Sequence, residues 1–157
     1  MSTELKRLHP LIRDLSFSDL DRVHEIEQSA YPYPWTAGIF ADCFKVGYHC
    51  SGLQVGPTLI GYAIQSQAAG ESHLLNLCVD PIWQGMGYGS LLLEHAIRVA
   101  KNLGCGGMFL EVRPSNPVGI GLYERRGFVT LGRRPDYYRS DDGREDAIIM
   151  NLNLQEN

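Results

Sequence analysis

The sequence lacks any long uninterrupted hydrophobic run. None of its apolar stretches approaches the roughly 20 residues that a membrane-spanning helix needs. No hydrophobic block follows residues 1–7, so we expect no secretory signal peptide. Hydrophobic residues make up 44% of the 157 positions and charged residues 20%, which is typical of a globular protein. We therefore expect one cytoplasmic domain that spans residues 1–157.

The sequence also lacks the spacing of a metal site and the charge of a nucleic-acid-binding protein. Its five histidines are scattered, and no ligand spacing relates its four cysteines, Cys43, Cys50, Cys78 and Cys105. Isolated cysteines of this kind indicate reduced thiols. Because neither the histidines nor the cysteines have the spacing of metal ligands, we expect no metal. The formal net charge of −4 argues against direct nucleic-acid binding and is compatible with a basic partner.

Hydrophobic periodicity and turn signals predict an α+β protein, with a mixed sheet and helices on its faces. Strands are expected over residues 11–15, 48–55, 58–67, 72–79 and 107–113, and two more within 128–154 around a turn at 141–143. Helices are expected over 19–30, 37–46, about 90–103 and 117–126. Ser18 is the predicted N-cap of the first helix, and Thr36 is that of the second.

The segment Gln84–Gly89 reads Gln-Gly-Met-Gly-Tyr-Gly and lies between a predicted strand and an amphipathic helix. This order aims free backbone N–H groups and the positive end of the helix dipole at one point, where phosphate binds. The segment has neither the Lys-Ser/Thr ending of a nucleotide P-loop nor the spacing of a dinucleotide fingerprint. A pyrophosphate-bearing acyl carrier suits it, although a glycine-rich turn also serves simply to reverse the chain.

Two further residues need an explanation. Glu111 interrupts the apolar strand Met108–Val112, and a buried carboxylate is rare unless it has a partner or a function. Taken alone, a bare strand end or a pairing with Arg113 or another nearby arginine explains Glu111 better than catalysis does. Tyr123, on a short amphipathic helix, is by itself explained as a core aromatic residue.

Taken together, the motifs resemble the GCN5-related N-acetyltransferase (GNAT) family. The segment Tyr137–Met150 is similar to the RimI branch of that family, the ribosomal-protein-alanine N-acetyltransferases. The similarity runs from about Ile12 to Leu154 and includes His24–Gln28, Pro34-Trp35, Gln84–Gly89, Leu110–Arg113, Ser115-Asn116, Leu122-Tyr123 and Gly127-Phe128.

The resemblance implies a mostly antiparallel mixed sheet that splays between the fourth and fifth strands, with helices on both faces. It also implies acetyl-CoA as the acetyl donor, bound where those strands separate. Backbone groups of Leu77, Cys78 and Val79 would bind the pantetheine arm, and Asn116 and Tyr123 would also contact the cofactor. The pyrophosphate would be held by Gly85, Met86, Gly87, Tyr88, Gly89 and Ser90.

The resemblance places a general base at Glu111 and a general acid at Tyr123. An amine attacks a thioester only when it is unprotonated, and at pH 7 roughly a tenth of N-terminal amines, with a pKa near 7.7–8.0, are free. A carboxylate would complete the deprotonation, directly or through one water, and a phenol would assist the leaving thiolate. None of the four cysteines lies in these motifs, which favours direct transfer.

The acceptor that the branch implies is the N-terminal alanine of a small-subunit ribosomal protein, followed by basic residues. A groove for it would lie between Tyr31–Trp35 and Tyr138–Arg144, and we expect Glu27, Trp35, Tyr138 and Asp141 to contact the peptide. Asp142 would also attract positive charge, although a solvated turn equally explains these acidic residues. Another N-terminus, a lysine or a small-molecule amine remains open as acceptor, as does a non-catalytic CoA-binding adaptor.

The chain departs from the family pattern at two positions. Gly85 and Ser90 stand where the family's phosphate loop is often basic. Backbone amides would still hold the pyrophosphate, but charge-assisted contacts would be lost, so we expect weaker CoA binding.

Overall fold

The computed structural model describes residues 9–155, which form two compact units. The first unit holds residues 9–65 and 76–96, and the second holds residues 66–75 and 97–155. Three elements continue from one unit into the other: strands β3 (Thr58–Ala68) and β4 (Glu71–Val79), and helix α4 (Tyr88–Asn102). The single domain expected from the sequence stays a prediction.

The elements follow the predicted order, and the α+β class is confirmed. The other strands are β1 (Pro10–Asp14), β2 (His49–Val55), β5 (Gly107–Val112), β6 (Val129–Ser140) and β7 (Gly143–Asn153). The other helices are α2 (Leu20–Ala30), α3 (Ala37–Val46), α5 (Pro117–Arg125) and the short 3-10 helices η1 (Phe17–Asp19) and η2 (Pro81–Trp83). Among the described residues, no helix has the length and apolar character to cross a membrane.

The strands join in the order β1-β2-β3-β4-β5-β7-β6. The pairing of β4 with β5 is parallel, whereas the pairings β1–β2, β2–β3, β5–β7 and β6–β7 are antiparallel. The predicted mixed, mostly antiparallel sheet is therefore confirmed.

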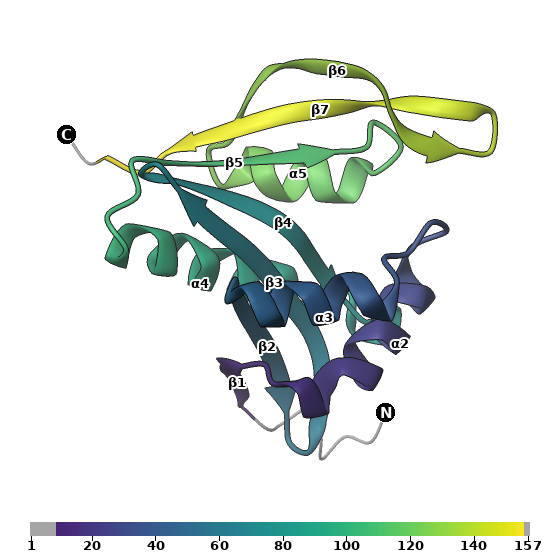
Figure 1. Ribbon diagram of the computed structural model, residues 1–157, viewed down its shortest axis with the longest axis vertical. Helices are drawn as coiled ribbons and strands as arrows, with labels where there is room; N and C mark the ends of the chain where they lie inside the picture. Colours follow the sequence, from purple (N-terminus) through teal and green to yellow (C-terminus); the bar gives the residue numbers. More distant parts are fainter. Residues whose placement is uncertain (1–8, 156–157) are drawn as a thin grey trace. The chain divides into compact units, whose positions relative to one another are not determined.

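The first unit packs α2 and α3 beside the strands β1–β3 (Figure 1). Phe40 of α3 meets Tyr62 of β3 edge-on, with ring centroids 5.5 Å apart, and both side chains are fully buried. Gly61 lets β3 come close to the end of β4, since a Cβ there would lie 2.8 Å from the carbonyl oxygen of Cys78. This close approach positions the end of β4, after which the chain continues to the glycine loop.

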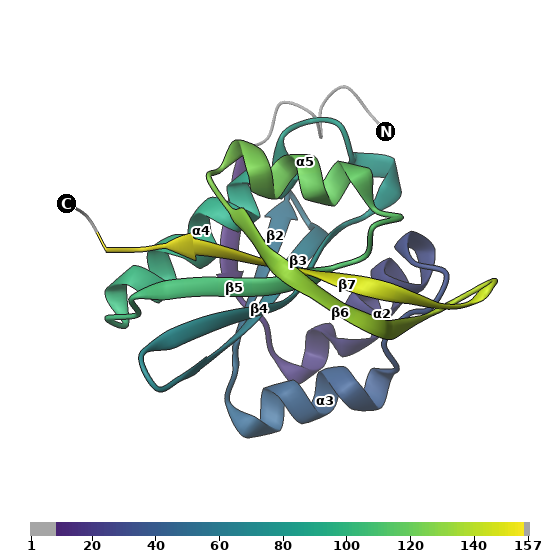
Figure 2. The ribbon, with the colours of Figure 1, turned by 90° about the horizontal axis from the view of Figure 1, so that it is seen from above.

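The second unit contains β5 beside β7, and β6 with β7 forms a long hairpin (Figure 2). Along β5, Met108, Leu110 and Val112 are buried, whereas Phe109 and Glu111 are only half-buried. Because side chains alternate between the faces of a strand, Phe109 and Glu111 share one face. The glutamate that interrupts the apolar strand therefore lies on its less covered face.

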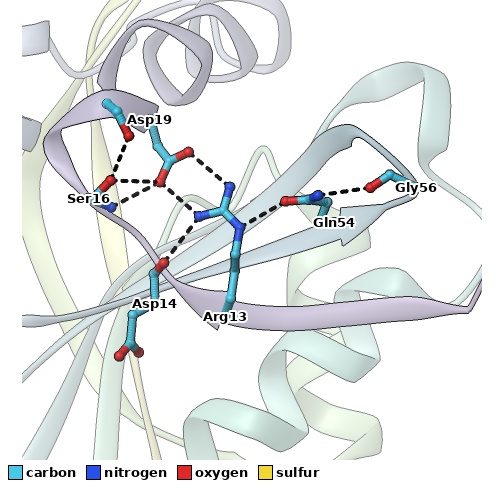
Figure 3. Close-up of polar contacts among 7 residues, drawn as sticks. Arg13, Asp14, Ser16, Asp19, Gln54 and Gly56 are labelled. Carbon is cyan, nitrogen blue, oxygen red and sulfur yellow. Dashed lines mark hydrogen bonds and ion pairs between the residues drawn. The ribbon is translucent and has the colours of Figure 1, made fainter.

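The start of the first helix differs from the prediction that Ser18 caps it. The chain first forms η1, whose N-cap is Ser16, and α2 begins at Leu20. The carboxylate of Asp19 reaches back to the backbone N–H of Ser16 (2.9 Å) and also accepts two bonds from Arg13 of β1, both 2.9 Å (Figure 3). Thr36 was predicted correctly, since its Oγ1 accepts a hydrogen bond from the N–H of Ile39.

We expect Asp19→Ala to lower the free energy of unfolding by about 1–2 kcal/mol at pH 7, because it removes the hydrogen bond to the Ser16 N–H and the Arg13 pair. Hydrogen bonds from Arg13 hold the pKa of Asp19 below its ordinary value, against the opposing effect of burial. The stabilisation is therefore present above the unfolded-state pKa near 3.9 and fades as the pH falls through the lower folded-state pKa. Urea denaturation of the wild type and the variant across this pH range measures the difference.

Asp21→Ala is the matched control, because Asp21 is exposed in the first turn of the same helix. An equal loss in the two variants, or a loss for Asp19→Ala that does not change with pH, would contradict the assignment.

Candidate functional site

The glycine loop has the geometry of an anion-binding turn. Strand β4 ends at Val79, η2 follows, and α4 begins at Tyr88. Gly85 and Gly87 have φ angles of 81° and 87°, a left-handed backbone conformation that residues other than glycine rarely adopt. The predicted strand, glycine loop and helix are thus present, and the loop leads into the unpaired N–H groups of the first turn of α4.

The turn before the loop is fixed by side chains from elsewhere in the first unit. Asp80 caps η2 by accepting from the N–H of Ile82 (3.1 Å), and its other oxygen accepts from Arg22 of α2 (2.7 Å). Arg22 also donates to the carbonyl of Leu59 (3.0 Å), and Gln84 donates to that of Val79 (2.9 Å). The sequence did not single out Arg22 because nothing local relates α2 to the end of β4.

The loop suits a pyrophosphate that is held by the backbone. Gly85, Met86, Gly87 and Ser90 are exposed, and Tyr88 and Gly89 are half-buried. None of these six residues is cationic, so the N–H groups and the helix dipole supply the attraction for an anion.

The end of β4 presents the three residues predicted to contact the pantetheine arm. Cys78 and Val79 are buried, and Leu77 is half-buried. The carbonyl of Leu77 already accepts a hydrogen bond from the hydroxyl of Tyr31 (2.9 Å). This hydrogen bond links β4 to the residue that follows α2. Binding of the pantetheine arm by the backbone of β4 stays a prediction.

Glu27 lies on α2 with only 2% of its surface exposed, at the centre of a hydrogen-bonded cluster. One carboxylate oxygen accepts from the hydroxyl of Tyr62 and from the side-chain amide of Asn76 (2.9 Å). The other accepts from the backbone N–H of Trp35 (2.9 Å). Glu27 was predicted to contact the acceptor. That contact is untested, and the structure gives the residue the additional task of holding the Trp35 segment.

Glu111 is paired with His73, a residue that the sequence did not single out. The Nε2 atom of His73 lies 2.6 Å from Oε2 of Glu111, and the two side chains are 23% and 12% exposed. The imidazole stacks on Phe109, with centroids 4.3 Å apart and an interplanar angle of 22°. The parallel register sets this arrangement, since His73 pairs with Phe109 across β4 and β5. Such a register between distant segments has no local sequence signal.

The electrostatics around Glu111 favour its ionised form. The hydrogen bond with His73 lowers the pKa of Glu111, burial opposes that shift, and the charges of His73 and Arg134 add to it. Burial, followed by the negative charge of Glu111, raises the pKa of Tyr138 on β6. Glu111 is therefore a carboxylate at neutral pH, and Tyr138 is a neutral phenol.

Tyr123 and Asn116 lie on the same segment of the second unit. Tyr123 of α5 is 8% exposed, and its ring packs 5.7 Å from that of Phe128. Asn116 is the N-cap of α5, where its Oδ1 accepts from the N–H of Gly119 (3.0 Å). Asn116 thus has a structural role, whereas its contact with the cofactor and the acid role of Tyr123 stay predictions.

Arg113 organises the hairpin of β6 and β7. It donates to Glu145 (2.8 Å) and to the carbonyl of Arg139, and its guanidinium lies 4.4 Å from the ring centre of Tyr138. Ser115 also donates to Glu145 (2.8 Å). Tyr138, one of the predicted acceptor contacts, is thus held under a cation, and Asp141 lies exposed at the hairpin turn.

The cysteines are poor nucleophiles. All four are free and buried. Burial raises the pKa of Cys50 and of Cys78 to about 12, and it also raises that of Cys43 and Cys105. Within residues 9–155, no three His, Cys, Asp or Glu side chains gather as a metal-binding group.

The family model described as the acetyltransferase (GNAT) family matches residues 20–128. The ribosomal protein bS18-alanine N-acetyltransferase of Escherichia coli (strain K12) is 40% identical over 141 residues, which cover 90% of this chain and 95% of that protein. The protein of the same description from Haemophilus influenzae is 36% identical, over 89% of this chain and 96% of its own length.

Solved structures agree with these sequence relatives. The crystal structure of the ribosomal-protein-S18-alanine N-acetyltransferase from Escherichia coli matches with a TM-score of 0.88 and 38% identity, covering 95% of this chain and 96% of that chain. Ard1 from Thermoplasma volcanium matches with a TM-score of 0.85 and 26% identity, covering 94% of this chain and 99% of that chain. The chain therefore belongs to the acetyltransferase (GNAT) family and is an acetyl-CoA-dependent N-acetyltransferase.

Proposed function

We propose that the protein acetylates the α-amino group of the N-terminal alanine of ribosomal protein bS18, in the cytoplasm and by direct transfer from acetyl-CoA. The observation that carries the proposal is the 40% identity, over 90% of this chain, with the bS18-alanine N-acetyltransferase of Escherichia coli. A direct transfer is supported by the raised pKa of all four thiols, which leaves no cysteine suited to form an acyl-enzyme.

In the proposed reaction, the unprotonated amine attacks the thioester carbonyl and the C–S bond breaks. Glu111 takes the proton that the amine loses, and its low pKa keeps it ionised and ready to do so at neutral pH. Tyr123 donates a proton or a hydrogen bond to the departing thiolate. The glycine loop with Ser90, the backbone of Leu77–Val79 and Asn116 hold the CoA portion.

The acceptor peptide, in this proposal, lies against Trp35, Tyr138 and Asp141. Glu27 acts on it chiefly by holding the Trp35 segment, because both of its oxygens already accept hydrogen bonds. The segment Arg133–Asp146 contains four arginines and five acidic residues, so it attracts a basic peptide only weakly.

Release of CoA with a basic peptide that begins with alanine tests the proposed reaction. We expect the wild type to turn over this peptide and to leave the same peptide untouched when its N-terminus is already acetylated. Peptides with another first residue, a free lysine side chain as sole amine, and a polyamine test the other acceptors. Faster turnover of any of these than of the alanine peptide would contradict the proposed acceptor.

Glu111→Gln tests the proposed base. We expect kcat to fall by about 10²–10⁴, because the amide accepts no proton, while the Kd for CoA changes by less than about twofold. Stopped-flow rates and isothermal titration measure the two quantities. Glu124→Gln is the control, since Glu124 is an exposed glutamate of the neighbouring helix α5. Full turnover in Glu111→Gln would refute the assigned base.

Ser90→Arg tests the idea that the loop lacks charge-assisted contacts. We expect the Kd for CoA to fall about five- to tenfold, and the gain to shrink as salt is added. Position 90 is preferable to position 85, where the φ of 81° would strain an arginine. Ser90→Gln is the neutral control, and an equal gain in the two variants would argue against a role for charge.

Alkylation of the native protein tests the absence of a reactive thiol. With a pKa of about 12, the thiols of Cys50 and Cys78 are ionised in only about one molecule in 10⁴–10⁵ at pH 7.5. We expect iodoacetamide to label the native protein slowly without loss of activity, and to label the urea-unfolded protein fully. Inactivation that parallels labelling of one native cysteine would point instead to an acyl-enzyme.

A further inference from the structure

The contact between Nε2 of His73 and Oε2 of Glu111 is a hydrogen bond, so one of the two atoms carries the hydrogen. An ionised carboxylate only accepts hydrogen bonds, so at 2.6 Å the Nε2 atom of His73 carries the hydrogen and donates it to Oε2 of Glu111. The direction of this bond is thereby fixed, because both the neutral and the protonated imidazole can donate from Nε2. The bond leaves Oε1 as the carboxylate oxygen that takes a further proton.

We propose that His73 is a positioning residue for the general base: it fixes the carboxylate of Glu111 so that Oε1 receives the proton of the acceptor amine. The proposal rests on the function proposed above for Glu111. Two features make His73 suited to this task. Its ring is itself held by stacking on Phe109, and the parallel register places His73 beside the strand that carries Glu111.

Other groups act on Glu111 without such a directed bond. Arg134 on β6 contributes positive charge, and Tyr138 on the same strand is a neutral phenol whose pKa the Glu111 charge helps to raise. On β5 itself, Phe109 is uncharged, and on β7 the residue paired with Glu111 is Ile149. Of these groups, His73 is the one that combines a short hydrogen bond with a rigid support.

The pH dependence of turnover separates positioning from simple packing. In the wild type, the His73 bond lowers the pKa of Glu111 and burial raises it. Without His73, only the charge of Arg134 and a backbone hydrogen bond of Glu111 itself still lower the pKa of Glu111 against the effect of burial, so the carboxylate protonates at higher pH. The acid limb of kcat/KM, expressed per unprotonated peptide amine, therefore moves to higher pH. A residue that only fills space would leave this limb unchanged.

The experiment compares His73→Ala and His73→Gln with the wild type. We expect His73→Ala to lower kcat about ten- to hundredfold and to shift the acid limb upward, with little change in the Kd for CoA. Glutamine does not ionise, but it keeps an N–H donor. Because the donor is kept, we expect His73→Gln to retain most of the wild-type kcat. His24→Ala, at a half-buried histidine of α2, is the control.

The outcomes distinguish this inference from the proposed function. If Glu111→Gln abolishes turnover while His73→Ala keeps the wild-type kcat and acid limb, the positioning role is wrong and the base stands. If Glu111→Gln is fully active, the proposed base itself is wrong. If His73→Ala lowers only the melting temperature, or if His73→Gln is as impaired as His73→Ala, His73 does not act through the donated bond.

Discussion

The first unit depends on the hydrogen bonds that the buried carboxylate of Glu27 accepts. Burying a polar group away from water costs free energy unless hydrogen bonds replace the lost hydration. Here the replacement comes from three segments: Trp35 after α2, Tyr62 on β3 and Asn76 on β4. The carboxylate therefore joins α2, the two strands and the Trp35 segment at one point.

The second unit uses the same principle at a more exposed carboxylate. Glu111 has His73 as its side-chain hydrogen-bond partner, and 12% of its side chain is exposed. Both oxygens of Glu27 accept side-chain or backbone hydrogen bonds, three in total, whereas the one side-chain bond described for Glu111 engages Oε2. A carboxylate with donors at both oxygens suits a structural junction, and one with a side-chain donor at a single oxygen suits proton transfer.

The sequence predicted the elements well, because hydrophobic periodicity and turn residues are local signals. Thr36 and the turn before Gly143 illustrate this, since each acts on residues within three or four positions. The helix cap at Ser18 was wrong because Asp19 is drawn toward Arg13 on another element. A local pattern does not contain that attraction.

The site was predictable only where a motif lies within one segment. Gln84–Gly89 and Glu111 could be found in this way, and the resemblance to a family added the chemistry. The partners were not predictable. Arg22 meets Asp80 across 58 positions, and His73 meets Glu111 across 38. Those meetings depend on strand register and helix packing, which emerge only from the folded chain.

The Trp35 segment has a consequence for the thermodynamics of recognition. Two prolines, Pro32 and Pro34, restrict its backbone, and hydrogen bonds tie both of its ends, through Tyr31 and Trp35. Its conformational entropy is therefore lost during folding and not during binding. In the proposed complex, the segment is already ordered before the peptide binds. The conformational entropy lost on binding is therefore mainly that of the peptide.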